Sequence, residues 1–315
     1  MPSNEPSLQV RQFLGLRNTD RPARLPMGSL VVAQNIDIDD TGGIERRAGY
    51  LSVAGLPGVT AAYGSRDETR LYVVNEGILK RVINLDPLVT MALATGIPAG
   101  EVWWAENGEH IFCSGAVNGI IQGDTFTLYA DFGSDDEQSF DAQGQTLSTD
   151  EADVGTLAPP SDTECVAFYE GSVWLSYYDT VADQSFIFRS KPFFWSRWDL
   201  SADYIAVPGR VRLLTSTGSG LVIGTDQAIW AYAQEAIQQL ADYGVVAGQA
   251  GEDQGRIYFW TQRGLCRALP FEALTEETVS VPPGTRACLA VTRQRGNKQA
   301  IIVTTGGGEA DNDYG

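Results

Sequence analysis

Six pairs of short apolar stretches recur along the chain, and a polar turn joins the two members of each pair. Val, Ile, Tyr, Trp and Phe dominate the stretches, and residues of this kind favour β-strands. Two such runs joined by a short polar turn predict a β-hairpin. The pairs occupy residues 59–74, 101–114, 165–178, 211–225, 245–261 and 288–304.

Further apolar stretches follow several pairs and predict a third strand in each of these repeats. They lie at 77–83, 124–130, 184–190 and 227–233. Only 233–243 has a spacing compatible with a helix. The second strands open 40, 62, 48, 36 and 44 residues apart, near the repeat length of a propeller blade. The chain is therefore predicted to be all-β, a six-bladed β-propeller with seven blades as the alternative.

The first fifty residues do not follow the blade pattern. We expect residues 1–53 to form an N-terminal arm that also supplies blade-closing strands, and residues 54–315 to form the propeller. Either 29–39 or 44–53 is expected to complete the last blade, because the chain after 288 is too short to do so. The stretch 35–43 is predicted to be a strand that leads into a Gly-Gly hairpin turn.

Charge is distributed unevenly along the chain. The net charge is −18, and between Val82 and Phe188 there are 18 acidic residues and no Lys or Arg. The other 22 acidic residues offset all 22 basic ones, so the net charge lies in this one segment. Within it, 131–162 accounts for the long spacing of 62 residues and is predicted to be an acidic insertion between two blades.

Two oppositely charged surfaces are candidates for function. The acidic loop is either a solvated loop that aids solubility or a surface that repels nucleic acid or docks a basic partner. The arginines of the arm are either solvated or form a docking arm for the acidic loop of the same chain or of a neighbour. The acidic loop contains Asp131, Asp135, Asp136, Glu137, Asp141, Asp150, Glu151 and Asp153; the docking arm contains Arg17, Arg21, Arg24, Arg46 and Arg47.

Residues for catalysis are scarce, and no enzymatic activity is predicted. His110 is the single histidine, and no Gly-x-Ser-x-Gly surrounds a serine, so a structural histidine is favoured over a Ser-His-Asp site. A glycosidase that uses two unidentified carboxylates stays a minor alternative. The four cysteines lie far apart in or beside strands, and we expect buried free thiols: Cys113, Cys165, Cys266 and Cys288.

Cofactors, metals and nucleic acid as a specific ligand are likewise not expected. The isolated His and Cys do not have zinc-ligand spacing, and the acidic stretch 35–43 lacks the order of a calcium loop. Nucleic-acid binding is disfavoured by the pI near 4.4 and by the presence of only three lysines. No apolar run has membrane-spanning length, and the N-terminus lacks the layout of a secretory signal, so folding in the cytoplasm is expected.

The N-terminal segment resembles the opening of virion structural proteins of tailed bacteriophages. The shared order is Gly-Leu, then Leu-Pro-x-Gly, then an Ala-x-Asn-Ile-Asp-Ile-Asp strand that leads to Arg-x-Gly-Tyr. The matching positions are Gly15, Leu16, Leu25, Pro26, Gly28, Ala33, Asn35, Ile36, Asp37, Ile38, Asp39, Gly42, Ile44, Arg47, Gly49 and Tyr50. The stretches 188–214, 220–233 and 259–264 also look like the middle blades of that group.

This resemblance implies a β-propeller of the tail hub or nozzle type, also called packaged-DNA stabilisation proteins. The implied role is a structural ring around the DNA channel that retains packaged DNA and conducts it during ejection, without binding it specifically. We expect a homo-oligomeric ring, a hexamer, in the tail or neck of a virion assembled in the host cytoplasm. The partners would be an adaptor- or portal-side ring and tail tip or fibre proteins, with no membrane contact. In this arrangement the acidic loop 131–162 is expected to face the channel, and the arginine arm 11–47 is expected to dock onto the neighbouring ring.

The alternative function is a receptor- or glycan-binding propeller at the tail tip. Exposed aromatic rings would contact a host glycan in that case, and the candidates are Phe194, Trp195 and Trp198. Packing between blades is the favoured interpretation of these three rings.

Overall fold

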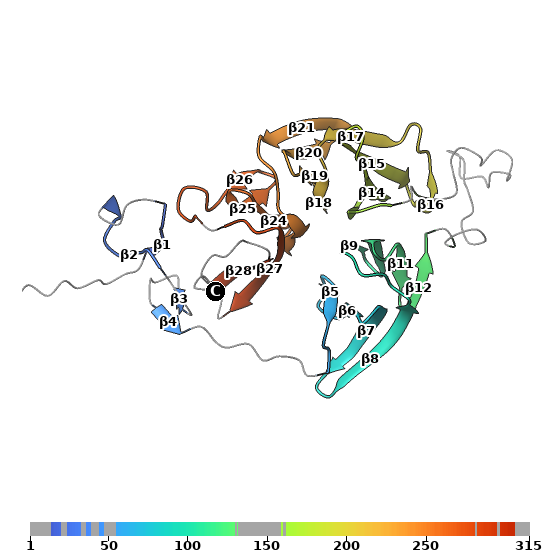
Figure 1. The fold of residues 1–315 in the computed structure, drawn as a ribbon, viewed down its shortest axis with the longest axis horizontal. Coiled ribbons are helices and arrows are strands. Elements are labelled where there is room, and N and C mark those ends of the chain that lie inside the picture. Colours follow the sequence, from blue (N-terminus) through green and yellow to red (C-terminus); the bar gives the residue numbers. More distant parts are fainter. Residues whose placement is uncertain are drawn as a thin grey trace, which may run out of the picture. The chain divides into compact units, whose positions relative to one another are not determined.

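The structure is a computed structural model that describes residues 14–19, 24–32, 36–38, 44–46, 55–129, 131, 159, 162–280, 282–294 and 297–305. Strands make up the regular structure of these residues, and the fold is a six-bladed β-propeller (Figure 1). The predicted fold class is thus confirmed. The chain divides into two units, Ser52–Gln249 and Met1–Leu51 with Ala250–Gly315, and each is described by itself below.

The unit Ser52–Gln249 begins with two four-stranded antiparallel blades. The first contains β5 (Val59–Gly64), β6 (Leu71–Asn75), β7 (Ile78–Leu85) and β8 (Leu88–Thr95). The second contains β9 (Val102–Asn107), β10 (His110–Gly115), β11 (Gly119–Gln122) and β12 (Thr125–Leu128). Turn chemistry sets these hairpins: Glu76 and Gly77, with φ of 52° and 72°, form the two-residue connection between β6 and β7.

The third and fourth blades complete this unit. The third contains β13 (Val166–Tyr169), β14 (Ser172–Asp179), β15 (Gln184–Lys191), β16 (Phe194–Trp198) and β17 (Tyr204–Pro208). The fourth contains β18 (Val211–Thr217), β19 (Gly220–Thr225), β20 (Ile229–Ala233) and β21 (Ala236–Ala241), and β22 (Ala247–Gln249) follows. One edge of β15 pairs with β17 and, at its end, with β16, so the β15–β16 hairpin extends beyond the blade.

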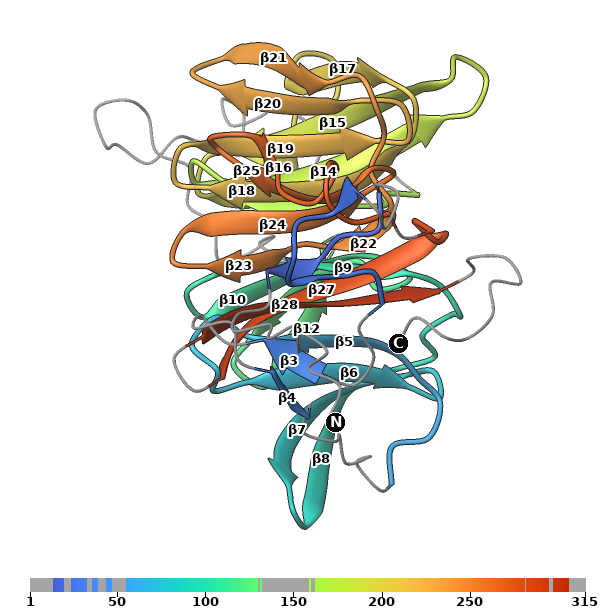
Figure 2. The same cartoon turned by 90° about the vertical axis from the view of Figure 1, so that its left-hand side faces the viewer.

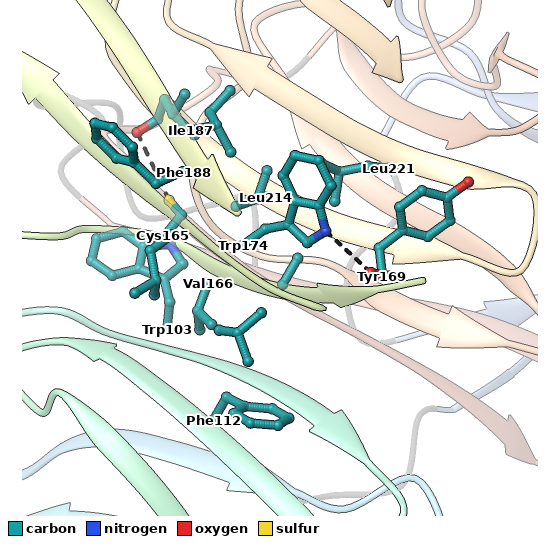
Figure 3. Close-up of a cluster of buried hydrophobic side chains, with 14 of the residues drawn as sticks. Trp103, Phe112, Cys165, Val166, Tyr169, Trp174, Ile187, Phe188, Leu214 and Leu221 are labelled. Atoms are coloured by element: carbon teal, nitrogen blue, oxygen red, sulfur yellow. Dashed lines mark hydrogen bonds between the residues drawn. The ribbon is translucent and has the colours of Figure 1, made fainter. Parts of the chain in front are cut away.

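Large apolar side chains fill the space between neighbouring blades of this unit. Phe112 of the second blade stacks on Phe168 of the third, with ring centroids 5.4 Å apart. Figure 3 shows Trp174 with Leu214 and Leu221 of the fourth blade, and the Trp174 indole donates to the Tyr169 carbonyl at 3.1 Å. Each fully buried side chain of this size stabilises the fold by about 1.5–3 kcal/mol, so the inter-blade layers hold the unit together.

The unit of Met1–Leu51 with Ala250–Gly315 contains the remaining strands. One blade consists of β23 (Gly251–Asp253), β24 (Arg256–Thr261), β25 (Gly264–Ala268) and β26 (Glu272–Ala273), and the last contains the hairpin of β27 (Arg286–Gln294) and β28 (Asn297–Thr305). The arm contains β1 (Gly15–Leu16), β2 (Ser29–Leu30), β3 (Ile36–Ile38) and β4 (Ile44–Arg46).

The arm strands pair with one another. β1 pairs with β2 in parallel, and β3 pairs with β4 in antiparallel register, from Ile36 opposite Arg46 to Ile38 opposite Ile44. The predicted strand is therefore confirmed, with β4 as its antiparallel partner, while the predicted turn at Gly42 and Gly43 lies outside the described residues. No described pairing joins β1–β4 to β27 or β28, so a blade-closing role for 29–39 or 44–53 stays a prediction.

Two expectations about single elements are corrected. The stretch 233–243 is not helical: β21 pairs with β20, and Gln234 and Glu235 form the turn with φ of 51° and 59°. Cross-strand pairing has overridden the local spacing there. The stretch 124–130 provides the fourth strand of its blade, because β11 is a separate short strand before it.

Candidate functional site

A buried carboxylate joins the first and second blades. Glu106, at the end of β9, has a side chain only 6 % exposed, and the side chain of Arg70 is 12 % exposed. The Glu106 carboxylate accepts hydrogen bonds from the Tyr63 hydroxyl at 3.0 Å, the Arg66 amide at 2.9 Å and the Arg70 guanidinium at 3.2 Å. These hydrogen bonds join the second blade to the first, so the Glu106 carboxylate has a structural role.

Arg70 extends this contact to the turn that follows β9. Its guanidinium also donates to the carbonyl oxygens of Gly108 at 2.8 Å and Glu109 at 3.0 Å. Charge-assisted hydrogen bonds of this kind are roughly twice as strong as neutral ones. The two loops that face each other between the blades are thereby held in one arrangement.

A second ion pair joins the third and fourth blades. The Arg210 Nε donates to both carboxylate oxygens of Glu164, at 2.8 and 3.0 Å, and these hydrogen bonds raise the pKa of Arg210. The Arg210 guanidinium also lies 5.5 Å from the centroid of the Tyr178 ring. The Tyr178 hydroxyl donates to Asp183 at 2.7 Å, and this bond raises the pKa of Tyr178. Glu164 is thus paired with a guanidinium and Asp183 with a hydroxyl, so both carboxylates stabilise the packing of strands.

His110 lies in an aromatic cluster between the second and third blades. Its ring packs edge-on against Trp195 with centroids 4.6 Å apart, and burial lowers the pKa of the imidazole. Phe112 packs edge-on against the same indole at 5.2 Å. The Trp195 indole in turn donates to the Gly171 carbonyl at 3.1 Å. This packing fits the favoured interpretation of His110 as a structural residue.

The three aromatic rings proposed for glycan contact differ in exposure. Trp198 is fully buried, which contradicts a surface role, and Phe194 and Trp195 are partly buried. The exposed ring of this region is Phe193, 74 % exposed, which the sequence did not single out. Its φ of 64° is unusual for a bulky side chain and places the ring over Gly171.

The cysteines are free, and three of the four are buried as expected. Burial raises the pKa of the Cys113 and Cys165 thiols, and Cys266 is also buried. Cys288 on β27 is exposed, so the expectation of a buried thiol is wrong at this position. Side chains alternate between the two faces of a strand. Ala287 and Leu289 are buried on one face of β27, so Cys288 between them points to the other face. Among the described residues no three His, Cys, Asp or Glu side chains come close enough to hold a metal ion.

The arm is fastened to 277–280 of the same unit. The Asn18 side-chain amide donates to the Ser280 carbonyl at 2.9 Å and accepts from the Ser280 amide at 2.6 Å, while the Thr19 hydroxyl donates to the Glu277 carbonyl at 2.7 Å. The backbone amide of Asn18 also donates to the Thr278 carbonyl at 3.0 Å. The Asn18 side chain thus bonds to both backbone groups of Ser280, as the backbone of a paired strand would. No pattern in the sequence predicts this role for Asn18.

The anchored arm presents basic and apolar side chains together. Arg17 and Arg24 are exposed, and four large apolar residues of 14–32 are also exposed. These residues are Leu14 (50 %), Met27 (64 %), Val31 (39 %) and Val32 (54 %). We call Leu14, Arg17, Arg24, Met27, Val31 and Val32 the arm surface. Exposed apolar side chains and arginines on one short segment are typical of a surface that binds another protein.

The remaining predicted site residues are only partly described. Arg46 lies on β4, and Arg21 and Arg47 lie outside the described residues. Asp131 is exposed at the start of the acidic loop. Outside the described residues lie Asp135, Asp136, Glu137, Asp141, Asp150, Glu151 and Asp153. The roles predicted for the docking arm and the acidic loop therefore stay predictions.

Comparison with solved structures finds other propellers. The extracellular domain of the one-component system BT4673 from B. thetaiotaomicron is 12 % identical over 82 % of this chain, with a TM-score of 0.42. The calcium-binding protein regucalcin from Agrobacterium tumefaciens is 11 % identical over 76 %, with a TM-score of 0.40. The WD40 propeller domain of Doa1 is 10 % identical over 80 %, with a TM-score of 0.43. The antiparallel blades described above make the chain a β-propeller protein.

All three TM-scores lie below 0.5, so these likenesses carry no argument about this chain. This chain covers 31 % of the BT4673 chain, 79 % of the regucalcin chain and 84 % of the Doa1 domain, and none of the three is a phage protein. No family description matches the sequence, and no curated protein matches it. None of the described residues belongs to a helix long and apolar enough to span a bilayer.

Proposed function

We propose that this protein is a structural, non-enzymatic component of a tailed-bacteriophage virion. In this proposal copies of the chain form a ring around the DNA channel, of the hub or nozzle type, and help to retain and conduct packaged DNA. The observation that carries the proposal is the arm surface, an exposed set of apolar and basic side chains on an anchored segment. It lies in the same N-terminal segment that resembles phage virion proteins.

The arm surface suits docking onto another virion protein. Its apolar side chains would be buried by a partner, and Arg17 and Arg24 would pair with carboxylates at the rim of the contact. Asn18 and Thr19 hold the arm through four hydrogen bonds to 277–280, so the surface is held in place at this end before a partner arrives.

The charge distribution supports a conduit that does not hold DNA. Each phosphate that a protein neutralises releases counterions and adds affinity, which would slow passage of the polymer. The segment from Val82 to Phe188 has no Lys or Arg and 18 acidic residues, so DNA near it gains no such affinity. The ion pairs of Glu106 with Arg70 and of Glu164 with Arg210 brace neighbouring blades, which suits a part that bears load.

Electron cryo-microscopy of the purified particle that carries the protein tests this proposal. Propeller density repeated around the tail axis, with the arm against a neighbouring ring, is the expected result. A particle assembled with the Arg17→Glu, Met27→Asp variant should lack that density. The matched control is Arg256→Glu, Val181→Asp, which also introduces two acidic residues in place of an arginine and an apolar residue, at exposed positions outside the arm. Density only at a peripheral fibre, or incorporation of both variants at the wild-type level, would refute the proposal.

Receptor or glycan binding at the tail tip is the second candidate, and Phe193 is the observation that favours it. Its ring is 74 % exposed on the turn before β16, beside the partly buried Trp195. An exposed aromatic face stacks well on the apolar face of a sugar ring. The isolated protein should then bind host cells or a glycan array, and Phe193→Ala should abolish binding while Val181→Ala does not. Equal binding by both variants, or none by the unmodified protein, rules this candidate out.

A further inference from the structure

The β15–β16 hairpin of the third blade has little backbone pairing of its own. β16 pairs with β15 at two positions, Ser190 opposite Trp198 and Lys191 opposite Phe194, and the register shifts between them. β17, by contrast, pairs with β15 along all five of its residues, and the two strands run side by side in Figure 2. The turn at 192–193 and the start of β16 therefore depend on side-chain contacts for their position.

Trp195 of β16 makes these contacts. Its indole Nε1 donates to the Gly171 carbonyl at 3.1 Å, which fixes the hairpin to the turn between β13 and β14. Phe112 and Phe168 pack edge-on against the indole, with ring centroids 5.2 and 6.1 Å away. The His110 ring lies closer than either, at 4.6 Å. An imidazole of the second blade is thus the nearest aromatic support of a hairpin of the third blade.

The surroundings of His110 suit a neutral ring. Asn107 and Gln122, opposite His110 on the neighbouring strands, are uncharged, and the third blade faces it with an indole. In the described part of the chain no carboxylate forms an ion pair with the imidazole. The charged groups that act on it are Glu109 of its own turn, whose side chain is exposed, and Arg70, which donates to the Glu109 carbonyl at 3.0 Å. Burial has the largest effect and lowers the pKa of the imidazole from its ordinary value of 6.5.

We propose that protonation of His110 releases the β15–β16 hairpin from the second blade, so that this contact is an acid-sensitive switch within the fold. Between the rings of Phe112 and Trp195 a charged imidazole loses hydration and gains no counter-ion. The protonated ring therefore moves out to water, and Trp195 loses its nearest support. The turn moves with it, because the Phe193 amide bonds to the same Gly171 carbonyl, at 2.8 Å.

The direction of the switch follows from the two states of the imidazole. The packed ring is neutral, and the released ring takes up a proton more readily, so the contact is complete above pH 6.5 and weakens as the pH falls below that value. His110 is the single histidine of the chain, and histidine alone among side chains has an ordinary pKa between about 5 and 8. The switch is therefore assigned to one residue. This proposal does not depend on the proposed function.

Nuclear magnetic resonance of the full chain, labelled with carbon-13 at histidine Cε1, tests the first half of the proposal. The single histidine gives a single resonance, and its titration measures the pKa of His110 directly. A pKa below 6.5 is expected. Trp195→Ala should move this pKa up towards 6.5, because removal of the indole exposes the imidazole to water. The matched control is Trp230→Ala, which removes a partly buried indole of β20 in the fourth blade and should leave the pKa unchanged.

Hydrogen exchange tests the release of the hairpin. After correction for the chemical exchange rate, the amides of 193–198 should exchange severalfold faster at about pH 5.5 than at pH 7.5, while those of 204–208 on β17 should not change. His110→Phe keeps an aromatic ring that cannot take up a proton, so its 193–198 amides should lose this pH dependence. If that variant does not fold, His110→Gln replaces it.

Three results overturn the proposal. The first is a pKa at or above 6.5, which attraction of a charged imidazole to the indole would produce. The second is a pKa that Trp195→Ala leaves unchanged. The third is exchange of 193–198 that does not rise at low pH, or that rises equally in the unmodified protein and in the His110 variant.

Discussion

Removal of the Glu106 carboxylate is the sharpest test of how the blades are held together. Glu106→Ala removes the carboxylate that pairs with the Arg70 guanidinium, whose side chain is 12 % exposed. The same carboxylate accepts a hydrogen bond from the Tyr63 hydroxyl and one from the Arg66 amide, and the variant loses both of these bonds. Loss of one member of a buried ion pair costs about 3–5 kcal/mol. Arg70 keeps the carbonyl oxygens of Gly108 and Glu109, so the lower end of that range is expected, about 3 kcal/mol of unfolding free energy.

Urea unfolding followed by tryptophan fluorescence measures this effect. With a slope of about 3 kcal/mol per molar urea, the midpoint of Glu106→Ala should fall by roughly 1 M. Glu109→Ala is the matched control, because it also removes one carboxylate, three residues further along the chain. The Glu109 side chain is exposed, and Arg70 bonds to the backbone carbonyl of Glu109, which the substitution keeps. Its midpoint should move by less than about 0.2 M, as surface substitutions do. Equal midpoints for the two variants would refute the reasoning.

Three further predictions concern single groups. Hydrogen bonds from Ser65 and Thr69 lower the pKa of Asp67 from 3.8 to about 2, so its contribution to stability is complete above pH 3.8 and is lost as the pH falls to 2. Asp67→Asn should therefore flatten the acid limb of the unfolding curve, and an unchanged limb would contradict the assignment. Cys288 alone should react with a thiol reagent in the folded protein, and a count of more than one reactive thiol before unfolding would contradict the burial of the other three. Asn18→Ala should speed tryptic cleavage after Arg17 severalfold without a change in the main unfolding transition, because it releases the arm from Ser280, and unchanged cleavage would show that the arm is held elsewhere.

The blades could be predicted from the sequence because each strand carries its own local signal. Runs of β-branched and aromatic residues mark the strands, and the turn at Glu76 and Gly77 marks a hairpin within a few residues. The stretch 233–243 does not show its strand locally, because its Ala, Gln and Leu also suit a helix and only its pairing with β20 makes it a strand. No apolar run marks β11, because its only apolar side chains are Ile120 and Ile121, between Gly119 and Gln122.

The inter-blade contacts could not be predicted because nothing local marks them. Arg70 and Glu106 lie 36 residues apart, and the chain has 40 acidic residues from which a partner could be chosen. The exposure of single aromatic residues could not be predicted either. Trp198 and Phe193 lie in one aromatic run, and the β15–β16 hairpin buries Trp198 and leaves Phe193 exposed. Pairing across a blade interface is a property of the assembled sheets.

The bond between Asn18 and Ser280 joins residues 262 positions apart, and it has a consequence for the order of synthesis. During translation the arm emerges before Ser280, so its anchor can form only after Ser280 has left the ribosome. The strands of Ser52–Gln249 are contiguous in the chain and can pair one after another as they emerge. A ribosome stalled before residue 280 should therefore carry formed blades with an unanchored arm, so the arm becomes competent to dock only on chains that extend past Ser280.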